Sequence, residues 1–163
     1  MLYALLAAAL VAVDQVVKYW VRANIPPYGS LPFLPHVMDL TYVQNTGAAF
    51  SLFSEHTWLL TILSAVIAVL VAVALFRKLF THPAGQICLT LVLAGAVGNL
   101  IDRFFFGFVT DMFMTTFVNF AVFNVADICV VLGGIATCLY IFFFYEKLEK
   151  REEKPHDTTQ ADS

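Results

Sequence analysis

The chain has 163 residues, of which 60% are hydrophobic and only 13% are charged. A soluble domain carries about 25% charged residues, so this composition excludes an ordinary soluble protein and indicates an integral membrane protein. The formal net charge of -3 argues against a nucleic-acid partner. No Cys or His spacing of the zinc-binding kind occurs, so we expect no metal site and no cofactor.

Four apolar runs are long enough, or nearly so, to cross a bilayer, which takes about 20 residues. They cover approximately residues 2–21, 58–76, 87–106 and 120–145. The pattern predicts an all-α polytopic membrane protein with four transmembrane helices, in a single membrane-embedded domain over residues 1–145. The first run lacks the basic start of a cleaved signal peptide, so we expect a retained anchor.

The connections between these runs differ in character. The first, residues 22–57, contains prolines and glycines that forbid a continuous helix. Within it, residues 37–53 are β-branched and aromatic with rough alternation, which predicts short strands on the membrane surface. The third connection, residues 107–119, is short. Residues 146–163 form a charged tail that we expect to be disordered and cytoplasmic.

The placement of Lys and Arg predicts the orientation, because these residues concentrate on the cytoplasmic side of a membrane. The second connection and the tail carry most of them, namely Arg77, Lys78, Lys147, Lys150, Arg151 and Lys154. The opposite side has only Lys18, Arg22 and Arg103. Both termini are therefore expected in the cytoplasm, with the first and third connections outside.

Polar residues interrupt the predicted helices near their external ends. Ionised groups inside a membrane are energetically costly, so each is expected to have a structural partner or a function. Asp14 and Lys18 are four residues apart, so we expect a structural ion pair that holds the first helix against the external connection. Asp102 and Arg103 are adjacent, and a structural network is the favoured role for this pair too. Two amides can form interhelical hydrogen bonds, Asn99 and Asn124.

Two further carboxylates, Asp111 in the third connection and Asp127 in the fourth helix, can reach the same external depth as Asp102. Carboxylates that share a site cannot both ionise cheaply, so one proton is held between them. One group then acts as a general base on water, while the protonated group donates to the carbonyl oxygen under attack. By spacing alone, any two of the three could form this pair.

Two other interpretations of the polar residues remain open. A small proton- or ion-coupled transporter would place them at the midplane and show repeat symmetry, whereas here they gather near one face and no repeat is visible. A non-enzymatic membrane scaffold would hold all the acids in structural networks. Other hydrolase classes are disfavoured, because neither His-Glu-x-x-His nor Gly-x-Ser-x-Gly occurs.

Four motifs follow one another along the four apolar spans and their connections. They are Asp14-Gln15-Val16-Val17-Lys18, Gln44-Asn45-Thr46-Gly47-Ala48-Ala49-Phe50-Ser51, Gly98-Asn99-Leu100-Ile101-Asp102-Arg103 with Val109-Thr110-Asp111 after it, and Phe123-Asn124-Val125-Ala126-Asp127. In this order they resemble the motifs of lipoprotein signal peptidases, or signal peptidase II, the aspartic peptidases of bacterial membranes. Each motif alone is weak evidence for this family, whereas the four motifs in this order are a specific signature of it.

The resemblance implies that Asp111 and Asp127 are the catalytic pair and that Asp102 is not part of it. The residues that it implies line or support the site are Asp14, Lys18, Asn45, Gly47, Asn99, Asp102, Arg103 and Asn124. Asn45 and Arg103 are expected to contact the substrate backbone or to order the water. Thr110 and Met112 depart from the family pattern, in which Val and Phe are commoner.

The resemblance also implies a substrate, a prolipoprotein whose lipobox Cys carries a diacylglyceryl thioether and which is cut just before that Cys. It implies a location in the bacterial cytoplasmic (inner) membrane, in contact with membrane lipids, with the active site near the external face. The external strands would form a small extracytoplasmic β-cradle that clamps an extended substrate segment. Nothing demands more than a monomer.

Overall fold

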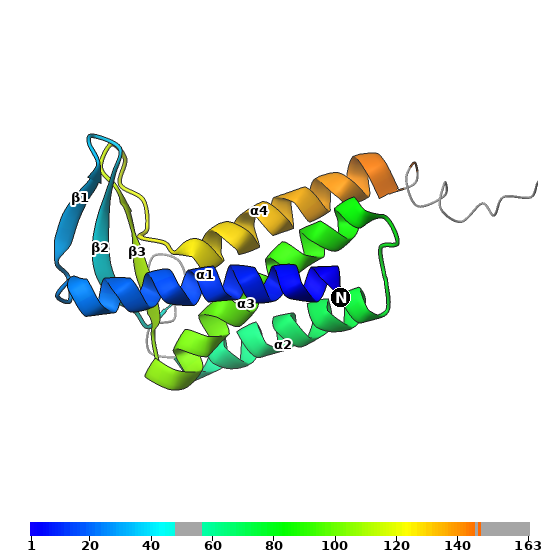
Figure 1. Cartoon of the computed structure of the whole chain (residues 1–163), viewed down its shortest axis with the longest axis horizontal. Coiled ribbons are helices and arrows are strands. Elements are labelled where there is room, and N and C mark those ends of the chain that lie inside the picture. Colours follow the sequence, from blue (N-terminus) through cyan, green and yellow to red (C-terminus); the bar gives the residue numbers. More distant parts are fainter. Residues whose placement is uncertain (48–56, 146, 148–163) are drawn as a thin grey trace, which may run out of the picture.

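The computed structural model describes residues 1–47, 57–145 and 147. Its elements are α1 (Leu2–Asn24), β1 (Ser30–Leu34), β2 (Met38–Asn45), α2 (Thr57–Phe76), α3 (Pro83–Phe106), β3 (Val109–Thr115), α4 (Val125–Leu139) and a π-helical continuation, η3 (Tyr140–Phe144). The helices form a bundle and the strands a sheet at one end of it (Figure 1). The start of α1 and the end of η3 lie at the opposite end (Figure 1).

Two expectations fall partly outside the described residues. The tail, residues 146–163, was expected to be disordered, and of it only Lys147 is described. The expected strands of residues 37–53 are described as far as residue 47, where β2 accounts for Met38–Asn45.

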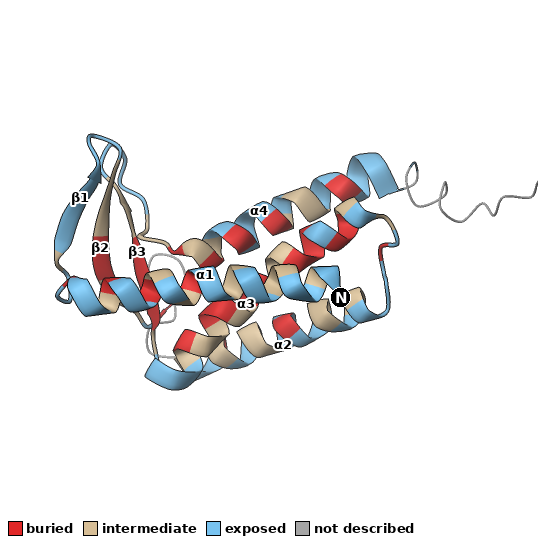
Figure 2. Ribbon diagram, in the orientation of Figure 1, coloured by how far each residue is buried: buried red, intermediate tan, exposed pale blue. Residues whose placement is uncertain are grey.

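The described part of the chain contains four helical segments that are long and apolar enough to cross a membrane. They are Leu2–Asn24, Thr57–Phe76, Pro83–Phe106 and Val125–Phe144. α3 is the central helix, since it packs against α1, α2 and α4. Much of the outside of the bundle consists of exposed residues (Figure 2). Many of these are large apolar residues, whereas Asp14 and Lys18 of α1 are buried. This distribution, with charges inside and apolar residues outside, agrees with the predicted class of membrane protein.

Two helix starts differ from the expected ones because local capping moves them. α3 begins at Pro83 and not near residue 87, since proline suits the first helical position and the His82 side chain accepts from the Ala84 N–H at 3.2 Å. α4 begins at Val125 and not near residue 120, because Asn124 caps it. The segment before α4 is thereby free to approach the sheet.

The sheet joins two connections that are far apart in sequence. Its order is β1-β2-β3, with both pairs antiparallel. β2 lies within residues 37–53, where strands were expected. β1 precedes that range and β3 belongs to the third connection, and neither was predicted. In the register of β2 with β3, Val43 lies opposite Asp111. The strand pairing therefore decides where Asp111 lies.

Glycines let α3 and α4 pack closely. A Cβ at Gly95 would collide with the carbonyl oxygen of Ala126, and a Cβ at Gly133 would lie 2.8 Å from the backbone nitrogen of Val92. Such contacts leave room only for glycine and bring two backbones together. The first turn of α4, which carries Asp127, is thus held directly against α3.

Candidate active site

Asp111 lies on β3 and faces a cavity in the bundle. Alternate residues of a strand point to opposite faces, so Val109 and Asp111 line this cavity while Thr110 points away from it. The Asp111 carboxylate is only 2% exposed. Its Oδ2 accepts from Asn45 Nδ2 at 2.8 Å, and its Oδ1 accepts from Asn124 Nδ2 at 2.7 Å.

Asp127 is the third residue of α4 and belongs to its N-terminal capping box. Its backbone N–H donates to Asn124 Oδ1 at 2.8 Å, and its Oδ2 accepts from the Asn124 backbone N–H at 3.1 Å. Its Oδ1 accepts from Asn99 Nδ2 at 2.7 Å. The Asn124 cap of α4 and the hydrogen bond from Asn99 of α3 therefore both hold the Asp127 carboxylate in place.

Both carboxylates line one cavity of about 550 Å³. Its other polar lining residues are Asn45, Ser64, Asn99 and Arg103. The remaining described walls are apolar and come from α2, α3, α4, the segment before α4 and Val109 of β3. Along α3 the lining extends from Val92 to Arg103, about 16 Å at 1.5 Å per residue. The cavity is therefore a long apolar space with a cluster of polar groups near its sheet end.

The Asp111 carboxyl holds its proton unusually well. Its burial, and to a smaller extent the nearby charge of Asp127, raise the pKa of Asp111 to about 7. Hydrogen bonds from Asn45 and Asn124 and the charge of Lys18 act in the opposite direction. At neutral pH this group can therefore both hold and release a proton, as a carboxylate pair with one shared proton requires.

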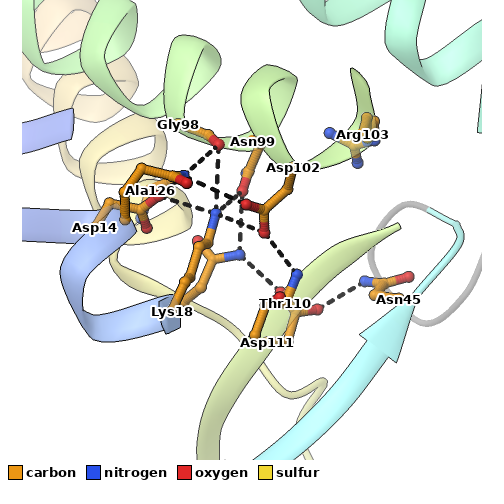
Figure 3. Close-up of polar contacts among 12 residues, drawn as sticks. Asp14, Lys18, Asn45, Gly98, Asn99, Asp102, Arg103, Thr110, Asp111 and Ala126 are labelled. Carbon is orange, nitrogen blue, oxygen red and sulfur yellow. Dashed lines mark hydrogen bonds and ion pairs between the residues drawn. The ribbon is translucent and has the colours of Figure 1, made fainter. Parts of the chain in front are cut away.

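Lys18 lies at the centre of the polar network behind the cavity (Figure 3). It forms ion pairs with Asp14 at 2.9 Å and Asp102 at 3.4 Å, so the expected Asp14–Lys18 pair is confirmed. The Asp14 Oδ1 accepts from the Ala126 N–H at 2.8 Å. The pair therefore holds α1 against α3 and α4, and not against the external connection as expected.

Lys18 also orients one of the amides that contact the carboxylates. Its Nζ donates to Asn99 Oδ1 at 3.0 Å, which turns Asn99 Nδ2 towards Asp127. Asn124 Nδ2 donates to the same Asn99 oxygen at 3.1 Å as well as to Asp111. The interhelical hydrogen bonds expected of these two amides are therefore present, and they reach both carboxylates.

Asp102 and Arg103 each join helices and connections, the structural role expected for this pair, but they do so with different partners. Adjacent helical residues point about 100° apart, so the two side chains diverge (Figure 3). Asp102 has Lys18 and Arg22 as its cationic partners, and its Oδ2 accepts from the Thr110 N–H at 2.8 Å. It lies behind β3 and does not line the cavity.

Arg103 faces the cavity and joins α3 to the neighbouring elements. Its Nη1 donates to Ser64 Oγ and its Nη2 to the Gly47 carbonyl, both at 3.3 Å. The Gly47 N–H in turn donates to Asn45 Oδ1 at 2.9 Å, which leaves Asn45 Nδ2 directed at Asp111. Among the described residues the buried Arg103 Nε has no hydrogen-bond partner. Residues 48–51 of the second motif lie outside the described residues.

Sequence reasoning assigned no site role to several residues that complete this network, namely Gln15, Arg22, Ser64 and Thr110. Gln15 Nε2 donates to the Gly98 carbonyl at 3.1 Å and to Asp102 Oδ1 at 3.3 Å. Arg22 could have been found by spacing, since it continues the four-residue step from Asp14 to Lys18 on one helix face. The roles of Ser64 and Thr110 depend on tertiary contacts that no local pattern signals.

The fold and the site together define a membrane protein in which two carboxylates face one cavity, the arrangement on which aspartic proteases depend. Residues 6–143 match the family model described as signal peptidase (SPase) II. The chain belongs to this family, and it is accordingly a protease of bacterial membranes. This membership gives no support to the transporter interpretation.

Similar proteins agree with this assignment. The chain is 38% identical to a lipoprotein signal peptidase of Clostridioides difficile (strain 630), over 90% of this chain and 99% of that protein. It is 40% identical to one of Lactococcus lactis subsp. lactis (strain IL1403), over 88% and 91%. A bacterial membrane enzyme solved by the in meso method at 2.3 Å resolution has a TM-score of 0.81 and 26% identity, covering 97% of this chain and 94% of its own.

Proposed function

We propose that Asp111 and Asp127 are the catalytic pair of an intramembrane aspartic endopeptidase and that they share one proton. The observation that carries this proposal is their meeting from separate elements, β3 and α4, at one end of a cavity with otherwise mainly apolar walls. Ionised groups in such surroundings are energetically costly, and in membrane proteins they usually mark a functional site. The raised pKa of Asp111 supports giving it the proton and giving Asp127 the role of base.

The reaction then proceeds without a covalent enzyme intermediate. Asp127 takes a proton from water, whose oxygen attacks the carbonyl carbon, while Asp111 gives its proton to the carbonyl oxygen. When the tetrahedral intermediate collapses, one of its two hydroxyls returns a proton to Asp111, the C–N bond breaks, and the departing nitrogen takes the proton held by Asp127. Arg103 and Asn45 line the same cavity, and in this proposal they orient the substrate backbone and the water.

We propose a diacylglyceryl-modified prolipoprotein as the substrate, cut just before its lipidated Cys. The relatives named above are lipoprotein signal peptidases. The apolar lining of about 16 Å along α3 suits a membrane-embedded segment next to the bond to be cut. Membrane lipids would cover the exposed apolar side chains of the four helices.

We further propose that the protein acts as a monomer in the cytoplasmic membrane, with both termini in the cytoplasm and the site near the external face. The excess of Lys and Arg in the second connection and the tail supports this orientation. The sheet lies at the end of the bundle opposite the start of α1 (Figure 1), which agrees with an external sheet.

The decisive experiment is cleavage of a diacylglyceryl-modified prolipoprotein by the purified protein. We expect Asp127→Asn to lower the rate about 10²- to 10⁴-fold, as loss of a general base does. Asp39→Asn on β2 is the matched control, because Asp39 does not line the cavity. Cleavage by folded Asp127→Asn at the wild-type rate would refute the mechanism. Equal cleavage of unmodified prolipoprotein would refute the proposed substrate class.

A further inference from the structure

Thr110, the residue before Asp111, is held on both its backbone and its side chain. Its N–H donates to Asp102 Oδ2 at 2.8 Å, and its Oγ1 accepts from Arg22 Nη1 at 2.9 Å. The same Nη1 lies 3.6 Å from Asp102 Oδ1. Thr110 and Asp102 are both fully buried. Three elements, α1, α3 and β3, therefore meet in a closed triangle directly behind Asp111.

The triangle is well suited to keeping its shape. The Arg22 guanidinium lies over the Phe106 ring, 4.5 Å from the ring centroid, which holds its plane in place. Asp102 is balanced by Lys18 at 3.4 Å as well as by Arg22, so its carboxylate is not left alone in the interior. Arg22 and Asp102 are thus each fixed by a contact outside the triangle, and Thr110 is fixed by its pairing with Gln44 of β2.

The Thr110 corner of the triangle reaches the site through the strand. Thr110 does not line the cavity, whereas its neighbours Val109 and Asp111 do. Because successive strand residues point to opposite faces, anchoring Thr110 fixes the direction in which Asp111 points. A valine at position 110 would fill nearly the same volume without the hydroxyl, so it would remove the bond to Arg22 and leave the packing nearly unchanged.

We propose that Arg22, Thr110 and Asp102 form a positioning device that holds the Asp111 carboxylate in its reactive place. The proposal rests on the catalytic role proposed for Asp111. None of the three residues needs to touch the substrate, so loss of the hydroxyl should affect turnover and leave substrate binding nearly unchanged. Misplacement of a catalytic group by a fraction of an ångström slows chemistry without a change in binding.

The test compares Thr110→Val with Thr110→Ser. We expect Thr110→Val to lower kcat about three- to tenfold with KM within about twofold of wild type, a change typical of one lost hydrogen bond. Thr110→Ser keeps the hydroxyl and should stay within about twofold of wild-type kcat. The matched control is Thr115→Val on the same strand, which removes a bond to the Val118 carbonyl far from Asp111 and should not change kcat.

A second arm replaces the other partner and leaves the strand intact. Arg22→Met should lower kcat at least as much as Thr110→Val, and the double variant should be no slower than Arg22→Met alone, because both changes break the same bond. The inference is overturned if Thr110→Val stays within about twofold of wild-type kcat, if Thr110→Ser is as slow as Thr110→Val, or if the two losses multiply. Measuring Asp111→Asn in parallel separates the two proposals: if it remains active, the proposed function itself fails.

Discussion

Asn124 and Asp127 bind each other reciprocally at the start of α4. Asn124 Oδ1 accepts from the Asp127 N–H at 2.8 Å, and Asp127 Oδ2 accepts from the Asn124 N–H at 3.1 Å. The Nδ2 of the same asparagine donates to Asp111 at 2.7 Å. One side chain therefore caps a helix, fixes one carboxylate and contacts the other. The hydrogen bonds of Asn124 therefore serve both the stability of α4 and the geometry of the proposed catalytic pair. Substitutions at Asn124 can distinguish these two roles.

Replacing Asn124 should separate capping from catalysis. Asn124→Ala removes the cap and should lower the free energy of unfolding by about 1 kcal/mol. Asn124→Ser keeps a capping oxygen but is too short to donate to Asp111, so it should melt near wild type and still cleave at least about tenfold more slowly. Apparent Tm in detergent and the cleavage rate check this. Wild-type cleavage by Asn124→Ser would contradict it.

The rate should fall on the alkaline side of neutrality. The pKa of Asp111 is raised to about 7, so above that pH Asp111 loses the proton that the proposed mechanism needs. Because the Asn45 hydrogen bond lowers the pKa of Asp111, Asn45→Ala should move the alkaline limb to higher pH. Profiles of kcat/KM against pH measure this shift. Asp39→Asn serves as the control, and a limb that moves to lower pH in Asn45→Ala would contradict the assignment.

Asp111 should also make stability depend on pH. Its folded-state pKa lies above the ordinary 3.8, so between that value and about 7 the folded protein binds a proton that the unfolded chain releases. The stabilisation is full below the ordinary pKa and is lost as pH rises through the folded one. Asp111→Asn should therefore flatten the decline of apparent Tm over this range. An unchanged decline would show that another group causes it.

Lys18 should be costly to remove alone and cheaper to remove with its partner. Lys18→Met leaves Asp14 buried without its cation, and loss of one member of a buried pair costs about 3–5 kcal/mol. Adding Asp14→Asn removes the unpaired charge, while Asp102 keeps Arg22 as a partner. The double variant should therefore recover part of the stability lost by Lys18→Met. Thermal melts of the single and double variants test this, and purely additive losses would count against it.

Much of the fold could be predicted because local composition decides it. Apolar length alone places four helices in a membrane, and the prolines of the first connection exclude a continuous helix there. The ends of the helices were harder to predict from the sequence, because the cap at Asn124 depends on which polar side chain folds back on the backbone. β3 was missed because a short alternating stretch becomes a strand only when β2 lies beside it.

By itself the sequence determined the class of protein, its four spans and, through ordered motifs, the family and the candidate residues. The tertiary structure adds the physical reason why the three nearby aspartates differ. Asp102 and Arg103 are neighbours in the chain, yet the turn of the helix sends one behind β3 and the other into the cavity. Asp111 reaches the cavity because strand alternation and the register with β2 direct it there. Such directions depend on how the elements pack, and spacing along the chain does not contain them.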